Sequence, residues 1–134
     1  MVTVLFICIH NAGRSQMAEA FFNKLSGGRY IGLSAGSKPS ENINPVVVDA
    51  MKEIGIDISG NKPKILTKEM LLEADLAITM GCGEDACPIA PNELREWNIE
   101  DPHGKSIEVI RKIRDDIRKK IENLIRELDK AKYK

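Results

Sequence analysis

Cys8 and Arg14 are the residues of this 134-residue sequence whose types and spacing most directly indicate chemistry. They stand six positions apart, with Gly13 between them, just after the apolar run Val2 to Ile7. A turn from a strand into a helix directs backbone N–H groups inward, and the helix dipole adds positive potential, so such a turn favours an oxyanion. Arg14 can present a planar fork to two oxygens of a tetrahedral anion. The stretch therefore predicts a small anion site.

The groups that favour a bound anion also favour the thiolate form of Cys8, which would make this cysteine a nucleophile. Ser15 is expected to donate to the thiolate. Asn11, a residue type that tolerates positive φ, is expected to brace the loop, and Gly13 to permit tight curvature. Alternatively, Cys8 is a small buried apolar residue, although this leaves the nearby arginine unexplained. The predicted oxyanion-binding residues are Ile9, His10, Asn11, Ala12, Gly13, Arg14 and Ser15.

Two further cysteines, Cys82 and Cys87, follow another apolar run that ends before Gly81. Three cysteines in all do not make a disulfide scaffold, so in a reducing compartment they are buried, metal-binding or redox-active thiols. A zinc site would need more ligands, and His10 and His103 offer no paired spacing. We therefore expect no metal site, and the pair is either redox-active or incidental.

Alternating apolar segments must position these residues. Strands separated by helices indicate a parallel α/β sheet, in which ligands bind at the carboxyl ends of the strands. Cys8 and Cys82 both fall at such ends, and residues 130–134 are expected to fray. The predicted strands cover residues 2–7, 30–35 and 76–80, and the predicted helices cover 16–25, 46–54, 67–74 and a long C-terminal segment that includes 110–128.

Composition limits the remaining possibilities. With 43% apolar and 4% aromatic residues, the chain suits one compact domain that covers residues 1–134. Twenty basic and twenty acidic residues give no net charge, which argues against a broad surface for nucleic acid or membrane lipid. No apolar stretch approaches the ~20 residues that cross a bilayer, and no charged leader precedes the first strand. A cytoplasmic monomer is expected.

The stretch Cys8–Ser15 has the C-x5-R-S pattern, and in it the chain resembles the low-molecular-weight protein tyrosine phosphatase superfamily. Residues 16–20 extend the pattern in a way similar to the thiol-coupled, thioredoxin-type arsenate reductases of that superfamily. The resemblance spans most of the chain and implies a single domain with a central four-stranded parallel sheet flanked by helices. Further matches lie at residues 34–36, 55–59, 79–83, 87–88, 97 and 101–102.

The resemblance also implies a reaction. Cys8 would attack arsenate, and Asp101, which is otherwise an ordinary Asp-Pro turn residue, would protonate the departing oxygen. Cys82 would then attack Cys8, releasing arsenite, and Cys87 would move the disulfide to Cys82. No cofactor would be bound; the reductant would be thioredoxin or a low-molecular-weight thiol with glutaredoxin-like help. Phosphate and sulfate would compete with arsenate.

The proposed bridge between Cys82 and Cys87 sets a condition on the chain between them. Five positions along a helix span ~7.5 Å, whereas a disulfide needs Cα atoms within about 7 Å. We therefore expect residues 81–88 to form a loop or to unwind when they are oxidised.

Two other functions use the same loop. A low-molecular-weight tyrosine phosphatase would hydrolyse the Cys8 adduct with water, but it would want aromatic walls around its substrate. A non-catalytic oxyanion-binding or phosphocysteine carrier module would hold the anion without turnover.

An ion is a further point of comparison. Some similar proteins hold potassium beside this loop with an acidic side chain, where the present chain has Lys62-Pro63-Lys64. A lysine ammonium is expected to take the place of the cation and brace Asn11 or Glu19.

Overall fold

The computed structural model describes residues 2–81 and 93–132 of the chain. Their strands form one sheet in which every neighbouring pair is parallel, in the order β2-β1-β3-β4. The central position of β1 brings its carboxyl end next to the ends of both neighbours. The strands are β1 (Thr3–Cys8), β2 (Ile31–Gly36), β3 (Leu76–Thr79) and β4 (Leu94–Glu96).

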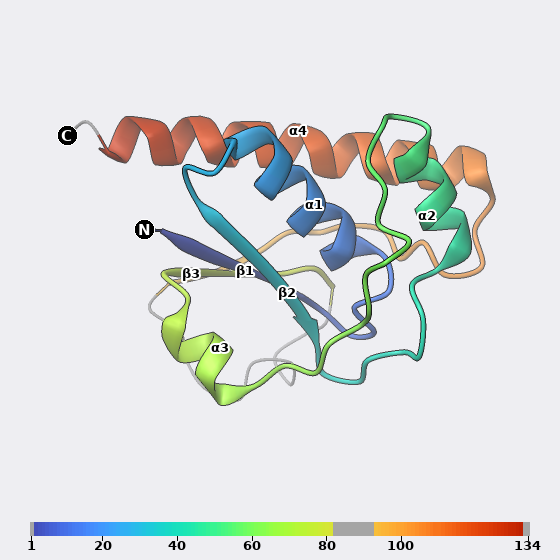
Figure 1. Ribbon diagram of the computed structural model, residues 1–134, viewed down its shortest axis with the longest axis horizontal. Helices are drawn as coiled ribbons and strands as arrows, with labels where there is room; N and C mark the ends of the chain where they lie inside the picture. Colours follow the sequence, from blue (N-terminus) through green and yellow to red (C-terminus); the bar gives the residue numbers. More distant parts are fainter. Residues whose placement is uncertain (1, 82–92, 133–134) are drawn as a thin grey trace.

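Helices cover both faces of the sheet (Figure 1). Helices α1 (Arg14–Ser26), α2 (Pro45–Lys52) and α4 (Ile107–Lys132) lie together on one face, where α4 contacts both α1 and α2. The short helix α3 (Lys68–Glu73) lies on the other face. The predicted α/β architecture with a four-stranded parallel sheet is therefore confirmed.

The uninterrupted apolar sequence of β1 follows from burial on both faces. Val4, Phe6 and Cys8 point into the larger core under α1, α2 and α4. Leu5 and Ile7 point into a smaller core against α3. Because alternate side chains enter different cores, no position from residue 4 to residue 8 faces solvent, and the one polar residue of the strand is the half-buried Thr3 at its start.

The ends of several elements differ from the sequence-based expectations. Helix α1 begins at Arg14, two residues earlier than predicted. The predicted oxyanion-binding residues 9–15, here called the anion loop, therefore pass directly into the first helical turn. Helix α4 continues to Lys132, and the expected fraying from Lys130 is wrong for the residues described. Apolar side chains of α4 at helical spacing, including Ile117 and Ile121, are buried in the larger core and support the long helix.

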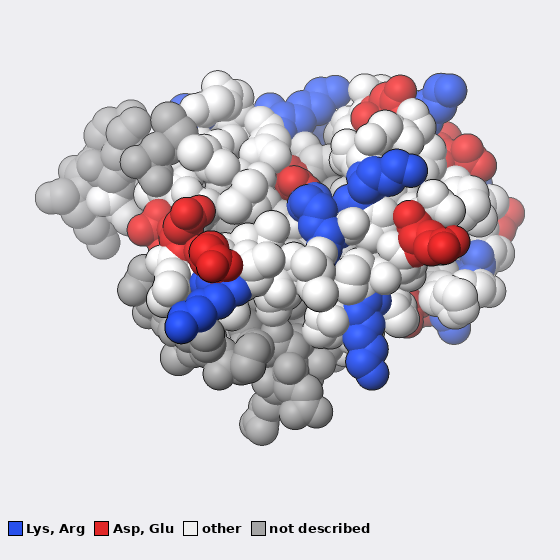
Figure 2. All heavy atoms as spheres, turned by 60° about the horizontal axis from the view of Figure 1, so that its bottom comes forward, with Lys and Arg blue, Asp and Glu red and all other residues white. Residues whose placement is uncertain are grey.

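Charged side chains are spread over the surface. Figure 2 shows lysine, arginine, aspartate and glutamate side chains interspersed on the face it presents, without one extended patch of either sign. In the described ranges 2–81 and 93–132, no helix is both long enough and apolar enough to cross a membrane.

The charged face of α4 makes one ion-pair cluster with the end of α2. Arg111 and Arg114 both bind the carboxylate of Glu53, with Arg111 Nη2 at 2.6 Å from Oε2 and Arg114 Nη1 at 3.0 Å from Oε1. Chiefly because of the hydrogen bond from Arg111, the pKa of Glu53 falls from 4.5 to about 2. The cluster therefore favours the folded chain only while Glu53 is ionised.

We predict that Glu53→Gln lowers stability in a pH-dependent way. Because the folded pKa is depressed, the contribution of Glu53 is present above pH 4.5 and is lost as the pH falls toward about 2. The difference in Tm between wild type and variant, measured by thermal unfolding at low salt, should shrink across this window. Glu73→Gln, an exposed glutamate at the end of α3, serves as the control, and an equal pH dependence in both variants would contradict the prediction.

Candidate active site

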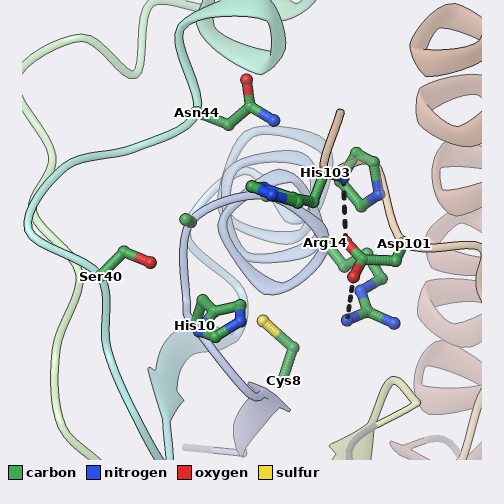
Figure 3. A pocket seen from close by; sticks show the side chains of 10 residues that line it. Cys8, His10, Arg14, Ser40, Asn44, Asp101 and His103 are labelled. Carbon is green, nitrogen blue, oxygen red and sulfur yellow. Dashed lines mark hydrogen bonds and ion pairs between the residues drawn. The ribbon is translucent and has the colours of Figure 1, made fainter. Parts of the chain in front are cut away.

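A small pocket opens at the carboxyl end of β1 (Figure 3). Cys8 is the last residue of that strand and is 2% exposed, with its sulfur turned toward the pocket. The pocket is lined by the loop after β1, by the loop before α2 and by the loop before α4. Its lining residues are Cys8, His10, Ala12, Gly13, Arg14, Ser40, Asn44, Asp101, Pro102 and His103.

The backbone of the anion loop is turned by hydrogen bonds from residues 38–44. The carbonyl oxygens of Ile9, His10 and Ala12 accept from the backbone N–H groups of Lys38, Ser40 and Asn44, at 2.8, 3.0 and 2.9 Å. In a trans peptide the N–H points away from the carbonyl of the same unit. Holding these carbonyls against residues 38–44 therefore aims the following amides away from that segment, which leaves them available to an anion.

Asn11 has a fixed side-chain orientation. Its Oδ1 accepts from the backbone N–H of Lys64 at 2.8 Å, and a backbone nitrogen can only donate. Its Nδ2 must then be the donor to Ser15 Oγ, 2.7 Å away. With that lone pair of Ser15 occupied, its hydroxyl hydrogen is free to point at Cys8 Sγ, at 2.8 Å. The network thus leaves a hydrogen-bond donor available to the sulfur.

The support for Asn11 comes from two further places. Gln16, fully buried, donates from Nε2 to Asn11 Oδ1 at 2.9 Å. Asn11 itself has φ +50°, so it is the asparagine that takes the left-handed conformation in this loop. Gly13 has φ −148° and ψ −86°, and its predicted role in tight curvature stays a prediction. A Cβ at Gly13 would lie 2.7 Å from Pro102 Cγ, so this glycine allows the loop before α4 to approach.

Lys64 contacts the same network through its side chain. Its Nζ lies 3.6 Å from Glu19 Oε1, which also accepts from Ser34 Oγ at 2.6 Å. The expected ammonium beside the loop is therefore present. The Lys64 side chain pairs with Glu19, and the Lys64 backbone N–H donates to Asn11.

Arg14 closes the pocket on the side of β3. It is 7% exposed, and its Nη1 donates to the carbonyl oxygen of Ile99 at 3.3 Å. Gly81, with φ +75°, lies against the guanidinium: a Cβ there would be 2.5 Å from Nη1. The absence of a side chain at Gly81 thus makes room for the arginine.

Asp101 faces Arg14 across the pocket. Its Oδ2 lies 3.9 Å from Arg14 Nη2, while its Oδ1 accepts from the backbone N–H of His103 at 3.0 Å. This second contact fixes the carboxylate in a turn. A carboxyl group held beside an anion clamp can exchange a proton with a bound oxyanion.

The rim of the pocket carries several polar side chains. His10 Nδ1 lies 3.1 Å from the carbonyl oxygen of Lys38, which only accepts, so Nδ1 carries hydrogen. Ser40, Asn44 and His103 complete the rim, and none of the described lining residues is Phe, Tyr or Trp. Among the residues that the structure describes, no group of three or more His, Cys, Asp or Glu could hold a metal ion.

Comparison with known proteins identifies the family. A family model for low molecular weight phosphotyrosine protein phosphatase matches residues 3–134. The chain belongs to this family. An arsenate reductase of Staphylococcus xylosus is 37% identical over 124 residues, which are 90% of this chain and 94% of that protein. The predicted superfamily is therefore confirmed.

Solved structures of the family share the fold. A structure described as an arsenate reductase in the phosphate binding state is 35% identical, with a TM-score of 0.86, and the alignment covers 95% of this chain and 98% of that one. The thioredoxin-dependent arsenate reductase Cg_ArsC1' of Corynebacterium glutamicum is 36% identical, with a TM-score of 0.85, over 98% of this chain and 63% of that one.

The structure brings most of the predicted site residues of this family member together. Cys8, Arg14 and Asp101 line one pocket with the anion loop. Cys82 and Cys87 lie outside the described residues. Sequence reasoning missed the 38–44 segment, because its contacts with the loop use backbone amides. It also missed Gln16 as a partner of Asn11, although the residue had been noted as part of the extended motif.

We predict that Ser15→Ala slows alkylation of Cys8 by iodoacetamide. Loss of a hydrogen bond to a charged group costs about 1.5–3 kcal/mol, so the rate at mildly acidic pH should fall about 10- to 100-fold. Mass spectrometry of the peptide that contains Cys8 gives the rate without interference from the other cysteines. Ser26→Ala, at the other end of α1, removes a buried hydroxyl that has no hydrogen-bond partner and should leave the rate unchanged. Equal rates in both variants would remove the role given to Ser15.

We also predict that the folded protein needs no potassium, because Lys64 already supplies a positive charge to Glu19. Replacing potassium by sodium in the buffer should leave the wild-type Tm and activity unchanged. Lys64→Met should lower stability by up to about 1 kcal/mol, as for a partly exposed ion pair. A strict dependence of wild-type activity on added potassium would contradict the prediction.

Proposed function

We propose that this protein is an enzyme that reduces arsenate to arsenite with electrons from an external thiol. Its membership in the phosphatase family and its similarity to arsenate reductases over about nine-tenths of the chain support this proposal. The pocket supports it in chemical terms, since its lining combines a cysteine, an arginine and the loop that leads into the N-terminus of α1, which suits an oxyanion.

In the first step, the Cys8 thiolate attacks arsenic in arsenate held by the loop amides and Arg14. A sulfur–arsenic bond forms and one arsenic–oxygen bond breaks. Asp101 gives a proton to the departing oxygen, which leaves as water. The product is a covalent adduct in which arsenic is still pentavalent.

In the second step, the Cys82 thiolate attacks the sulfur of Cys8. The new sulfur–sulfur bond forms as the sulfur–arsenic bond breaks, and its electron pair goes to arsenic. Two thiolates are thereby oxidised to the Cys8–Cys82 disulfide, and arsenic(V) becomes arsenic(III), which leaves as arsenite.

In the third step, Cys87 attacks Cys82, so that Cys8 is freed and a Cys82–Cys87 disulfide remains for the reductant. We propose thioredoxin as this reductant, because a related structure is that of a thioredoxin-dependent arsenate reductase. The alternative is a low-molecular-weight thiol with glutaredoxin-like help. We further propose that the protein acts as a cytoplasmic monomer, that phosphate and sulfate compete with arsenate, and that no cofactor is bound.

One observation carries the redox proposal furthest. Arg14, the residue that would hold the anion, lies against Gly81, and the next residue in the chain is Cys82. The chain that carries the second cysteine thus leaves β3 at the border of the anion pocket. The composition of the rim supports the same proposal, because a phosphotyrosine ring would find no Phe, Tyr or Trp side chain among the described lining residues.

We predict that all three cysteines are required for turnover. Arsenate-dependent oxidation of NADPH, measured with thioredoxin and thioredoxin reductase, should be abolished in Cys8→Ser, Cys82→Ser and Cys87→Ser. In one turnover without reductant, Cys87→Ser should release arsenite and trap the Cys8–Cys82 disulfide, detectable by mass spectrometry. A parallel assay with glutathione and glutaredoxin tests the other electron source.

Slow hydrolysis of p-nitrophenyl phosphate provides the control for folding. It needs the first step only, so Cys82→Ser and Cys87→Ser should retain it while Cys8→Ser loses it. A tyrosine phosphatase would hydrolyse phosphotyrosine efficiently without Cys82, and a carrier module would turn over neither substrate. Either result, together with an absence of arsenate reduction by wild type with both reductants, would reject the proposed function.

A further inference from the structure

The anion pocket contains an acidic side chain as well as donors. Asp101 Oδ2 lies 3.9 Å from Arg14 Nη2, and Figure 3 shows the carboxylate between the guanidinium and His103. Arg14 Nη1 is bound to the carbonyl of Ile99, so Nη2 is the terminal nitrogen turned to Asp101. An anion that bridges Arg14 and the loop amides therefore brings one of its oxygens close to this carboxylate.

Two oxygens in such a contact need a proton between them. An ionised carboxylate only accepts, and so does an unprotonated oxygen of the anion. Two negatively charged oxygens in direct contact also repel each other. At neutral pH arsenate and phosphate each keep at least one O–H group, whereas sulfate keeps none. Arsenate can therefore donate to Asp101, while sulfate can make the contact only if Asp101 first takes a proton from solvent.

We propose that Asp101 is a specificity-determining residue that admits protonated oxyanions, namely arsenate and phosphate, and disfavours sulfate at neutral and higher pH. The inference deepens the proposed function, since it specifies which ions share the arsenate pocket. Sulfate remains a competitor, but one whose binding is linked to the uptake of a proton at Asp101.

The other charged groups around Asp101 do not make this distinction. Arg14 attracts all these anions, and a Cys8 thiolate repels all of them. The rings of His10 and His103 both border the pocket, and a positive charge on either ring would favour every anion alike. Glu100 lies beside Asp101 in sequence but is 58% exposed and pairs with Lys105 at 3.9 Å.

The geometry of Asp101 permits a substitution that changes little else. Its Oδ1 accepts from the His103 backbone N–H, and an asparagine Oδ1 can accept in the same way. Asp101→Asn then places an amide NH2 where Oδ2 stands. The variant exchanges one acceptor for a donor and removes one charge, while it keeps the turn.

The test measures anion binding without catalysis. In the full chain carrying Cys8→Ser, which stops the chemistry and removes the thiol as a titrating group, the Kd of phosphate and of sulfate is measured by calorimetry from pH 5.5 to 8. Constant ionic strength and two buffers of different ionisation enthalpy give the protons taken up. We expect sulfate affinity to fall by about tenfold per pH unit with uptake of about one proton, in excess of any fall seen with phosphate.

The added Asp101→Asn substitution should abolish this excess and tighten sulfate binding by about tenfold or more at pH 7.5. Phosphate binding should change much less. Glu100→Gln is the matched control. It removes the charge of a residue that is next to Asp101 in sequence but is not among the described lining residues, so it should leave the ratio of the two affinities unchanged.

The inference fails if sulfate and phosphate show the same pH dependence, or if Glu100→Gln shifts the ratio as much as Asp101→Asn. Either result is separable from the proposed function, because wild-type arsenate reduction is measured independently. A protein that reduces arsenate but binds both anions alike keeps the function and loses this inference. If neither anion binds, the assignment of the pocket itself is overturned.

Discussion

The side-chain amide of Asn11 is the part on which the reactive end of this molecule depends. A backbone N–H of residue 64 fixes which way the amide points, and the amide then donates to Ser15, whose hydroxyl hydrogen is left free to point at the sulfur of Cys8. If the amide were reversed, its oxygen would compete with the sulfur for the serine hydrogen. The chemistry at residue 8 is therefore decided by a main-chain contact more than fifty positions away in sequence.

Close approach at three glycines brings the surrounding segments to this point. Gly36 faces the carbonyl of Ile9, where a Cβ would lie 2.5 Å away, so the end of β2 can lie against the anion loop. Gly13 makes the same room for Pro102, and Gly81 for Arg14. Each contact joins the loop to a different part of the chain. A side chain at any of these positions would push apart segments that must meet within a few ångströms around one small ion.

The sequence alone predicts the architecture because its signals are local. The continuous apolar run of β1, the glycine after it and the arginine that begins α1 predict a parallel sheet with a loop between β1 and α1 at its carboxyl edge, and the sheet and this loop are found. The backbone support from residues 38–44 could not be predicted, since any residue type other than proline supplies an N–H. The close approach of Pro102 to Gly13 could not be predicted either, because the two residues are far apart in the sequence. Asn44 is the N-cap of α2, a role that its position before Pro45 indicates locally. That local pattern does not indicate the contact of its backbone with the loop after β1.

The loop around Cys8 accepts hydrogen bonds from the segment 38–44 and from the backbone N–H of Lys64, and its neighbours are residues 81 and 99–103. None of these contacts exists in a newly made or unfolded chain, in which Cys8 is an ordinary thiol flanked by isoleucines. The contacts that would activate the sulfur therefore exist only in the complete tertiary structure. Under the proposed function, a chain still being synthesised carries no activated nucleophile that oxidants could attack, because the site is assembled only when folding ends.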